Sequence, residues 1–140
     1  MLYLLIITDT ENSYNDYSED FCIGIFESKQ QAKETAKHYL KNVQGFCDYQ
    51  CTYQIIEKEF INSTAAKNAN EVWLVQGWNV NENSDETDLI ESQCLTTENQ
   101  ALSELETLKK RFKRQEWNIS KWIIGQKNWQ NGFIRTNKKA

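Results

Sequence analysis

Half of the carboxylates in this 140-residue sequence lie in two short segments. Residues 9–20 and residues 79–91 each carry five of the 20 acids and contain no Lys or Arg. Clustered carboxylates create a negative potential that speeds encounter with a cationic partner, and Tyr14 and Tyr17 add aromatic anchors of the kind found in interfaces. We therefore predict a surface for a basic partner protein, formed with these two tyrosines by Asp9, Glu11, Asp16, Glu19, Asp20, Glu82, Asp85, Glu86, Asp88 and Glu91.

Two other interpretations of the acidic segments stay open. Solvated connections rich in carboxylates keep a protein soluble without binding anything. A calcium site would use the same oxygen ligands, but both segments lack the glycine and the regularly spaced Asp residues of an EF-hand loop. The acids indicate a charged surface without identifying its ligand.

The cysteines give no complete metal or redox motif. Cys22 and Cys94 fall in apolar runs and are expected to be small, reduced core residues. Cys47 and Cys51 are separated by three residues, which fits neither a redox C-x-x-C motif nor a zinc knuckle. Adding His38 still leaves a zinc site without a fourth ligand. We expect no metal and no cofactor.

No motif assigns catalysis. His38 follows Glu34 by four residues, so the two share a helix face, and a surface ion pair is commoner there than an acid–base pair. The sequence contains no nucleophile elbow, phosphate loop, dinucleotide fingerprint or zinc-protease motif. We expect a protein that is not an enzyme.

A basic run follows in the second half of the chain. It surrounds Phe112 and consists of Lys109, Lys110, Arg111, Lys113 and Arg114. Cations at the end of a helix complement its dipole, which is one interpretation; a contact to phosphate or RNA is the other. The overall acidic balance makes nucleic acid an unfavoured partner.

Composition and charge distribution narrow the class of protein. The net charge is −4, aromatic residues reach 12%, and the longest apolar run is Leu2–Ile7. Aromatic residues at this density indicate a folded core, and a membrane span needs about 20 apolar residues. We expect a soluble cytoplasmic protein. Its charge is local, because residues 1–70 carry 6 basic and 10 acidic side chains, whereas residues 71–140 carry 10 of each.

The secondary-structure elements that must position these residues are predicted to form one unit that occurs twice in the sequence. Strands are predicted at Tyr3–Thr8 and Phe21–Phe26, followed by a helix that Ser28 caps at its start and Gly45 at its C-terminus, and by a third strand through Tyr53 that ends near Phe60. At an offset of 69 residues the pattern recurs, with strands at Val72–Trp78, Leu89–Leu95 and Lys121–Lys127 and a capping box at Thr97 and Gln100. The offset places Tyr53 on Trp122.

The first copy resembles a family of small uncharacterised bacterial and phage domains. The resemblance rests on Ile23-Gly24-Ile25-Phe26-Glu27-Ser28, on Ala32 and Ala36 in the following helix, and on Gly45-Phe46-Cys47-Asp48-Tyr49. It covers about the first 60 residues, and the second copy lacks the Gly-Phe element. It implies an α+β domain and no activity, since that family has no assigned one.

We therefore expect the α+β class, with two three-stranded antiparallel β-β-α-β units paired as a pseudo-two-fold dimer. The units would span residues 1–61 and 71–136, joined by a linker at 62–70 and followed by a tail at 137–140. The expected function is a non-catalytic interaction module, such as an acidic immunity protein that inhibits a basic toxin. One alternative is a small-molecule binder or enzyme, with a pocket between the halves lined by Tyr53, Trp73, Trp78 and Trp122. A structural homo-oligomer that pairs through an unguarded strand edge is the other.

Overall fold

Two β-sheets, each with one helix, form the α+β fold. The computed structural model describes residues 1–10, 19–61, 70–79 and 89–134. The chain divides into a first unit, which comprises Leu2–Glu57 and Gly125–Ala140, and a second unit, which comprises Lys58–Ile124 and Met1. The linker predicted at 62–70, apart from Asn70, and the predicted tail at 137–140 lie outside the described residues.

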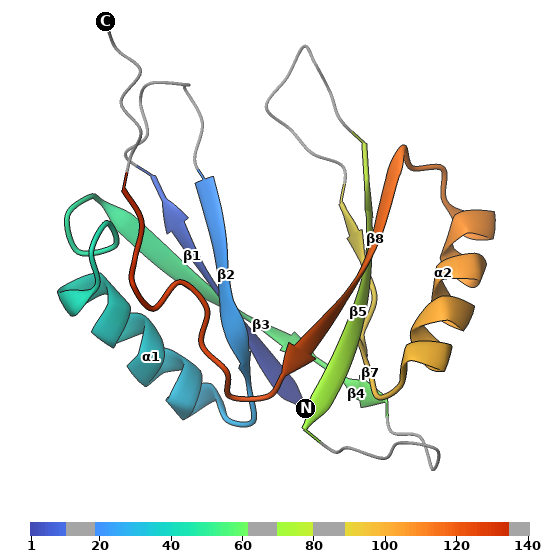
Figure 1. The fold of residues 1–140 in the computed structure, drawn as a ribbon, viewed down its shortest axis with the longest axis horizontal. Coiled ribbons are helices and arrows are strands. Elements are labelled where there is room, and N and C mark those ends of the chain that lie inside the picture. Colours follow the sequence, from blue (N-terminus) through green and yellow to red (C-terminus); the bar gives the residue numbers. More distant parts are fainter. Residues whose placement is uncertain (11–18, 62–69, 80–88, 135–140) are drawn as a thin grey trace, which may run out of the picture. The chain divides into compact units, whose positions relative to one another are not determined.

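The sheet of the first unit has the order β2-β1-β3, with β1 (Leu2–Asp9) in the centre (Figure 1). β2 (Glu19–Phe26) pairs antiparallel with β1, and the register shifts between Leu5 and Ile6. The third strand, β3, is Cys51–Lys58. β1 and β2 confirm the first two predicted strands and extend them, β1 by one residue at each end and β2 by two residues at its start.

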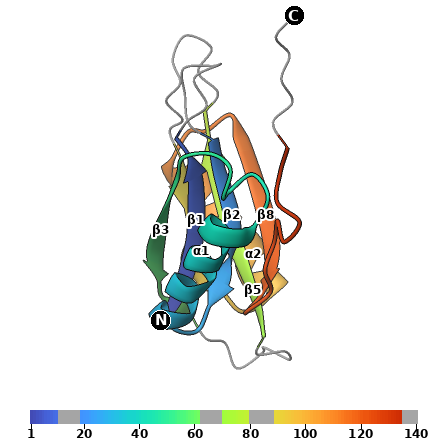
Figure 2. The same cartoon turned by 90° about the vertical axis from the view of Figure 1, so that its left-hand side faces the viewer.

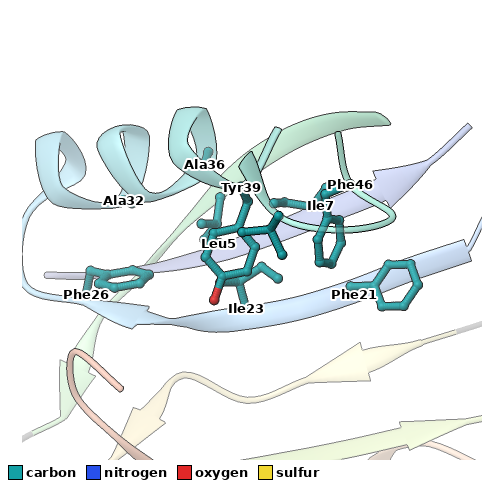
Figure 3. Packing of buried hydrophobic residues seen from close by; sticks show 10 residues of the cluster. Leu5, Ile7, Phe21, Ile23, Phe26, Ala32, Ala36, Tyr39 and Phe46 are labelled. Carbon is teal, nitrogen blue, oxygen red and sulfur yellow. The ribbon is translucent and has the colours of Figure 1, made fainter. Parts of the chain in front are cut away.

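Helix α1 (Lys29–Asn42) lies over β1 and β2, as Figure 2 shows face-on. The Ser28 side chain accepts a hydrogen bond from the Gln31 amide, which confirms the predicted N-cap. Ala32 and Ala36 are fully buried against the sheet, and their small side chains let the helix approach closely. Figure 3 shows Tyr39 reaching between the helix and the strands.

The helix ends differently from the prediction. Its C-cap is Val43 in extended conformation, whose amide donates to the Tyr39 carbonyl. Gly45 lies two residues further on, in a turn with φ +86°. The turn places Phe46 in the core, where its ring packs against Phe21 at 5.2 Å.

The second unit is built on β5 (Glu71–Trp78), which pairs antiparallel over its whole length with β8 (Glu116–Ile123). On the other side of β5 lie the short strands β6 (Ile90–Glu91) and β7 (Cys94–Leu95). Helix α2 (Glu98–Arg111) packs on this sheet, and its core includes Val75 and Leu108. The Thr97–Gln100 capping box is present, as predicted.

The prediction of a single strand at Leu89–Leu95 is wrong, because the structure has two short strands there. Ser92 lies between β6 and β7, where its Oγ accepts a hydrogen bond from the Val75 amide and donates to the Gln93 carbonyl. The Ser92 amide in turn donates to the Val75 carbonyl at 2.9 Å. The side chain takes a place that a ladder hydrogen bond would fill, so the strand is divided in two.

The third strand of each predicted copy ends differently from the prediction, because the chain exchanges segments between the units. After β3, the short strand β4 (Phe60–Ile61) pairs parallel with β7 in the second unit. After β8, residues 125–134 return to the first unit and run along β2 (red in Figure 1). The predicted strand at Lys121–Lys127 instead begins at Glu116 and ends at Ile123, before the turn at Gly125 with φ +85°.

Candidate functional site

Two of the predicted partner-binding acids are not on a free surface. Asp9 is the last residue of β1 and is 0% exposed. Glu91 forms an ion pair with Lys58, and its other carboxylate oxygen accepts a hydrogen bond from Gln76 Nε2 at 2.6 Å. Both carboxylates belong to paired strands: β1 extends one residue beyond its predicted end to include Asp9, and Glu91 lies in β6, within the strand predicted at Leu89–Leu95.

Glu19 and Asp20 are exposed at the start of β2. Asp20 accepts a hydrogen bond from Thr8 Oγ1 at 2.6 Å across the β1–β2 ladder, so its carboxylate has a fixed position at the edge of the connection. The remaining predicted members of this surface lie outside the described residues: Glu11, Tyr14, Asp16, Tyr17, Glu82, Asp85, Glu86 and Asp88.

A buried polar cluster that sequence reasoning missed centres on Lys58. Its side chain is 7% exposed, and besides the ion pair to Glu91 its Nζ donates to the Ser92 carbonyl at 3.1 Å. Just beyond it, the Glu59 amide donates to Gln93 Oε1 and the Glu59 carbonyl accepts from the Cys94 amide. Among the described residues every buried side-chain N or O atom has a partner. The closed arrangement is structural and fixes β4 to the second unit.

The thiol nearest this cluster is not activated. Burial raises the pKa of Cys94 to about 11, despite the opposing effect of the Lys58 charge. A thiol with this pKa stays protonated at neutral pH, and only the thiolate is a strong nucleophile. Desolvation also raises the pKa of Cys47, together with the Asp48 carboxylate, to which the Cys47 thiol donates at 3.7 Å.

The described residues provide no metal cluster of three or more His, Cys, Asp or Glu side chains, and no disulfide joins the four cysteines, all of which lie in the described ranges. His38 lies on the exposed side of α1 and bonds to Asn42 at 3.2 Å through Nδ1. Glu34 accepts instead from Gln30 at 3.0 Å. The two residues share a helix face, as predicted, but each bonds to another neighbour.

The aromatic residues predicted to line a pocket do not share one environment. Tyr53 packs against the helix-side core of the first unit. Trp73 packs against the helix-side core of the second unit. Trp122 pairs with Val72 and Trp78 with Glu116, so both lie on the opposite face of β5 and β8 from Trp73. Tyr53 and Trp73 thus each contribute to the core of a different unit.

The basic run is located at the end of α2, as expected. Arg111 and Arg114 flank the Phe112 ring, with guanidinium carbons 5.4 and 5.7 Å from its centroid. Phe112 is the C-cap, and Lys109, Lys110 and Arg111 belong to the last turn. The charges therefore complement the helix dipole.

A second feature that sequence reasoning missed is the aromatic cluster around residues 125–134. The Phe133 ring stacks on Phe21 at 4.6 Å and meets Phe46 edge-on at 4.9 Å. Trp129 contacts Phe21 edge-on at 4.9 Å while remaining 47% exposed. Tyr39, whose pKa burial raises, donates its hydroxyl to the Asn128 carbonyl at 2.8 Å.

The local signal for this cluster is weak. The Trp129-Gln-Asn-Gly132-Phe133 run is rich in aromatic residues and glycine, and two of its residues have positive φ, Trp129 at 61° and Gly132 at 76°. Such a run indicates an irregular, closely packed turn. It does not indicate which surface the turn packs against.

The chain has no match among protein-family models, curated proteins or solved structures. Neither helix in the described ranges is long and apolar enough to cross a membrane.

Proposed function

We propose that the protein is a non-catalytic interaction module that binds a basic partner protein through its acidic connections. The observation that carries the proposal is the charge of the two hairpin connections. With Asp9 and Glu91 removed, each still contains four acids and no Lys or Arg. An uncompensated negative surface of this kind favours encounter with a cationic protein.

The strand register supports this assignment. Asp9 pairs with Glu19, so the residues between them close the β1–β2 hairpin at one end of its sheet. Gly77 pairs with Ile90, so the second acidic connection closes the β5–β6 hairpin in the same way. Each acidic connection therefore joins two antiparallel strands that are neighbours in one sheet. In its concrete form the protein is an inhibitor of the immunity type, which covers the cationic substrate surface of an enzyme.

Affinity capture with two charge variants tests the proposal. The first variant replaces the remaining acids of both connections with their amides, at Glu11, Asp16, Glu19, Asp20, Glu82, Asp85, Glu86 and Asp88. The matched control replaces eight glutamates outside the connections, at Glu27, Glu34, Glu57, Glu59, Glu98, Glu104, Glu106 and Glu116. Both variants gain the same charge, so only the position of the change differs.

We expect the wild type and the control to retain the same basic protein from a lysate of the source cells, and the first variant to lose it. Binding of the purified partner should weaken as salt rises, because exposed charges are screened beyond about 8 Å at physiological ionic strength. Binding that changes neither with salt nor with the eight substitutions in the acidic connections would contradict the proposal.

The proposal includes a duplicated origin for the two units. β1 and β5 begin at residues 2 and 71, and α1 and α2 begin at residues 29 and 98, in each case 69 positions apart. β3 and β8 begin at residues 51 and 116, only 65 positions apart, because the connection after α1 is longer and contains Gly45 and Phe46. A single ancestral β-β-α-β unit accounts for this pattern. The pseudo-two-fold pairing stays a prediction.

A further inference from the structure

Residues 125–134 contact the first unit as a bound peptide contacts a receptor. β2 has β1 on one side only in the described sheet. Along its other side, the Gly125 amide donates to the Ile25 carbonyl at 2.8 Å and the Asn128 amide donates to the Ile23 carbonyl at 2.7 Å. Main-chain hydrogen bonds from a segment to a sheet edge are a recurring mode of peptide recognition, and here they come from an irregular segment with turns rather than from a strand.

An aromatic anchor adds specificity to these backbone contacts. The Phe133 ring is held between Phe21 and Phe46, and its amide donates to the Gln44 carbonyl at 3.0 Å. Trp129 covers another edge of Phe21. Buried aromatic anchors within a backbone-bonded segment supply most of the affinity in such complexes.

Glycines on both partners allow the close approach. A Cβ at Gly45 would lie 2.5 Å from the Phe133 ring, and a Cβ at Gly24 would lie 2.5 Å from the Gln126 carbonyl oxygen. On the segment itself, a Cβ at Gly132 would lie 2.0 Å from the Gln44 carbonyl oxygen. We call the surface formed by the β2 edge and residues 44–46 the cradle. Because Gly24 and Gly45 carry no side chain, the cradle has room for the segment at both positions.

Apart from Phe133, which packs against the core of the first unit, most of the segment lies at the surface. Residues 126–131 are all exposed, and residues 124–134 contain no helix or strand. Trp129 adopts a left-handed φ of 61°, a conformation that a non-glycine residue keeps only when its surroundings impose it. The segment is therefore fixed by the cradle and not by its own conformational preference.

We propose that the cradle is a peptide-binding site for a Trp-x-x-Gly-Phe segment of another protein in the same turned conformation, and that residues 125–134 occupy it as a competing internal ligand. A partner carrying this pattern would make the same two bonds to β2 and place its phenylalanine between Phe21 and Phe46. Release of the internal segment then exposes the site.

Binding of a synthetic peptide to the full chain tests the proposal. The probe is a fluorescein-labelled peptide with the sequence of residues 125–134. The receptor is the full-length chain with Trp129→Ala and Phe133→Ala, which removes both anchors of the internal segment. We expect saturable binding to this variant, and binding to the wild type weaker by about tenfold or more, since the tethered segment competes at millimolar effective concentration.

Two controls locate the binding. A peptide with alanine in place of its phenylalanine should bind about tenfold more weakly or worse. Gly45→Ala in the receptor variant should abolish binding, because the added methyl group fills the position of the phenylalanine ring. A folded receptor variant that does not bind the peptide, or that binds both peptides equally, overturns the proposal.

A measurement on the wild type applies even if the double variant does not fold. Unlabelled peptide at millimolar concentration should accelerate hydrogen exchange at the Asn128 and Phe133 amides of the isotope-labelled chain, because these amides lose their acceptors on β2 and Gln44. Unchanged exchange would show that the segment is a fixed part of the fold. A concentration-dependent dimer that the Phe133→Ala substitution abolishes would identify a second copy as the donor of the segment.

Discussion

Lys58 is the residue on which the junction between β3 and β4 depends. Its ammonium group is buried with Glu91 and donates to the Ser92 carbonyl. Lys58→Met removes the positive charge and leaves the Glu91 carboxylate, whose side chain is only 13% exposed, without its counter-charge, which we expect to lower the free energy of unfolding by about 3–5 kcal/mol. Urea denaturation followed by circular dichroism measures this loss.

The double variant Lys58→Met with Glu91→Leu is the matched control. It removes both charges, so most of the lost stability should return. Equal destabilisation in the single and double variants would mean that packing of the lysine stem, and not charge compensation, holds this junction.

Ionisation of Cys94 should lower the free energy of unfolding at alkaline pH. Burial raises the pKa of its thiol from 9.0 to about 11, so the folded state favours the neutral form. The stabilisation is complete below pH 9 and is lost as pH rises towards 11. Over this interval the wild type should lose about 2–3 kcal/mol more than Cys94→Ala. Chemical denaturation at pH 8, 9, 10 and 11 compares the two, and parallel profiles would contradict the assignment to this thiol.

Single charged residues show where sequence reasoning fails at this scale. Asp9 and Lys58 lie at the ends of apolar runs, where a charge normally indicates that a strand has reached solvent. Both are nevertheless buried in the structure. For Lys58 the partners lie more than 30 residues along the chain, at Glu91 and Ser92, and no pattern around position 58 specifies them.

At the scale of elements, the helices were predictable because their signals are local. The caps at Ser28 and Thr97 lie next to the apolar stripes that they begin, and both caps are confirmed. The third strands were less predictable, since constant spacing was assumed after each helix. The longer connection after α1, which carries Gly45 and Phe46, shifts β3 relative to β8.

The two N-caps differ in one testable respect. Gln100 Oε1 accepts hydrogen bonds from the Thr96 amide, the Thr96 hydroxyl and the Thr97 amide. Because Thr96 is buried, Gln100→Ala should destabilise the protein by about 1–3 kcal/mol. The corresponding Gln31 is exposed and gives only its backbone amide to Ser28, so Gln31→Ala should change the stability by less than about 0.5 kcal/mol. Similar urea midpoints for the two variants would contradict this difference.

Two glycines of the C-terminal segment separate backbone strain from steric exclusion. Gly125 and Gly132 both have positive φ, but a Cβ at Gly125 meets nothing within 4 Å, whereas one at Gly132 meets the Gln44 carbonyl oxygen at 2.0 Å. Gly125→Ala should therefore cost only the strain of a left-handed alanine, about 1–2 kcal/mol. Gly132→Ala should lower the melting temperature by clearly more than Gly125→Ala does, and it should also release the segment from β2. Equal melting temperatures would show that the close approach to Gln44 is not maintained.

At the scale of the whole molecule, the exchange of segments decides which parts of the chain depend on one another. The first half of the sequence supplies β4 to the second unit, and the second half supplies residues 125–134 to the first. Neither stretch is predictable from local pattern, because each is completed by a strand edge that lies far away in sequence. The predicted linker at 62–70 therefore lies between two secondary-structure elements, but the residues before and after it do not correspond to the two units.

This topology predicts the behaviour of a chain that is cut once. A protease site inserted within residues 62–69 yields two fragments, each of which contributes a segment to both units. After cleavage, the fragments should remain associated during size-exclusion chromatography under native conditions and separate only in denaturant, because separation removes β4 from β7 and residues 125–134 from β2. The same cleavage after Phe133→Ala, which removes the aromatic anchor of one exchange, should weaken the association measurably. Complete separation of the cleaved wild type without denaturant would show that the exchanged segments do not hold the halves together.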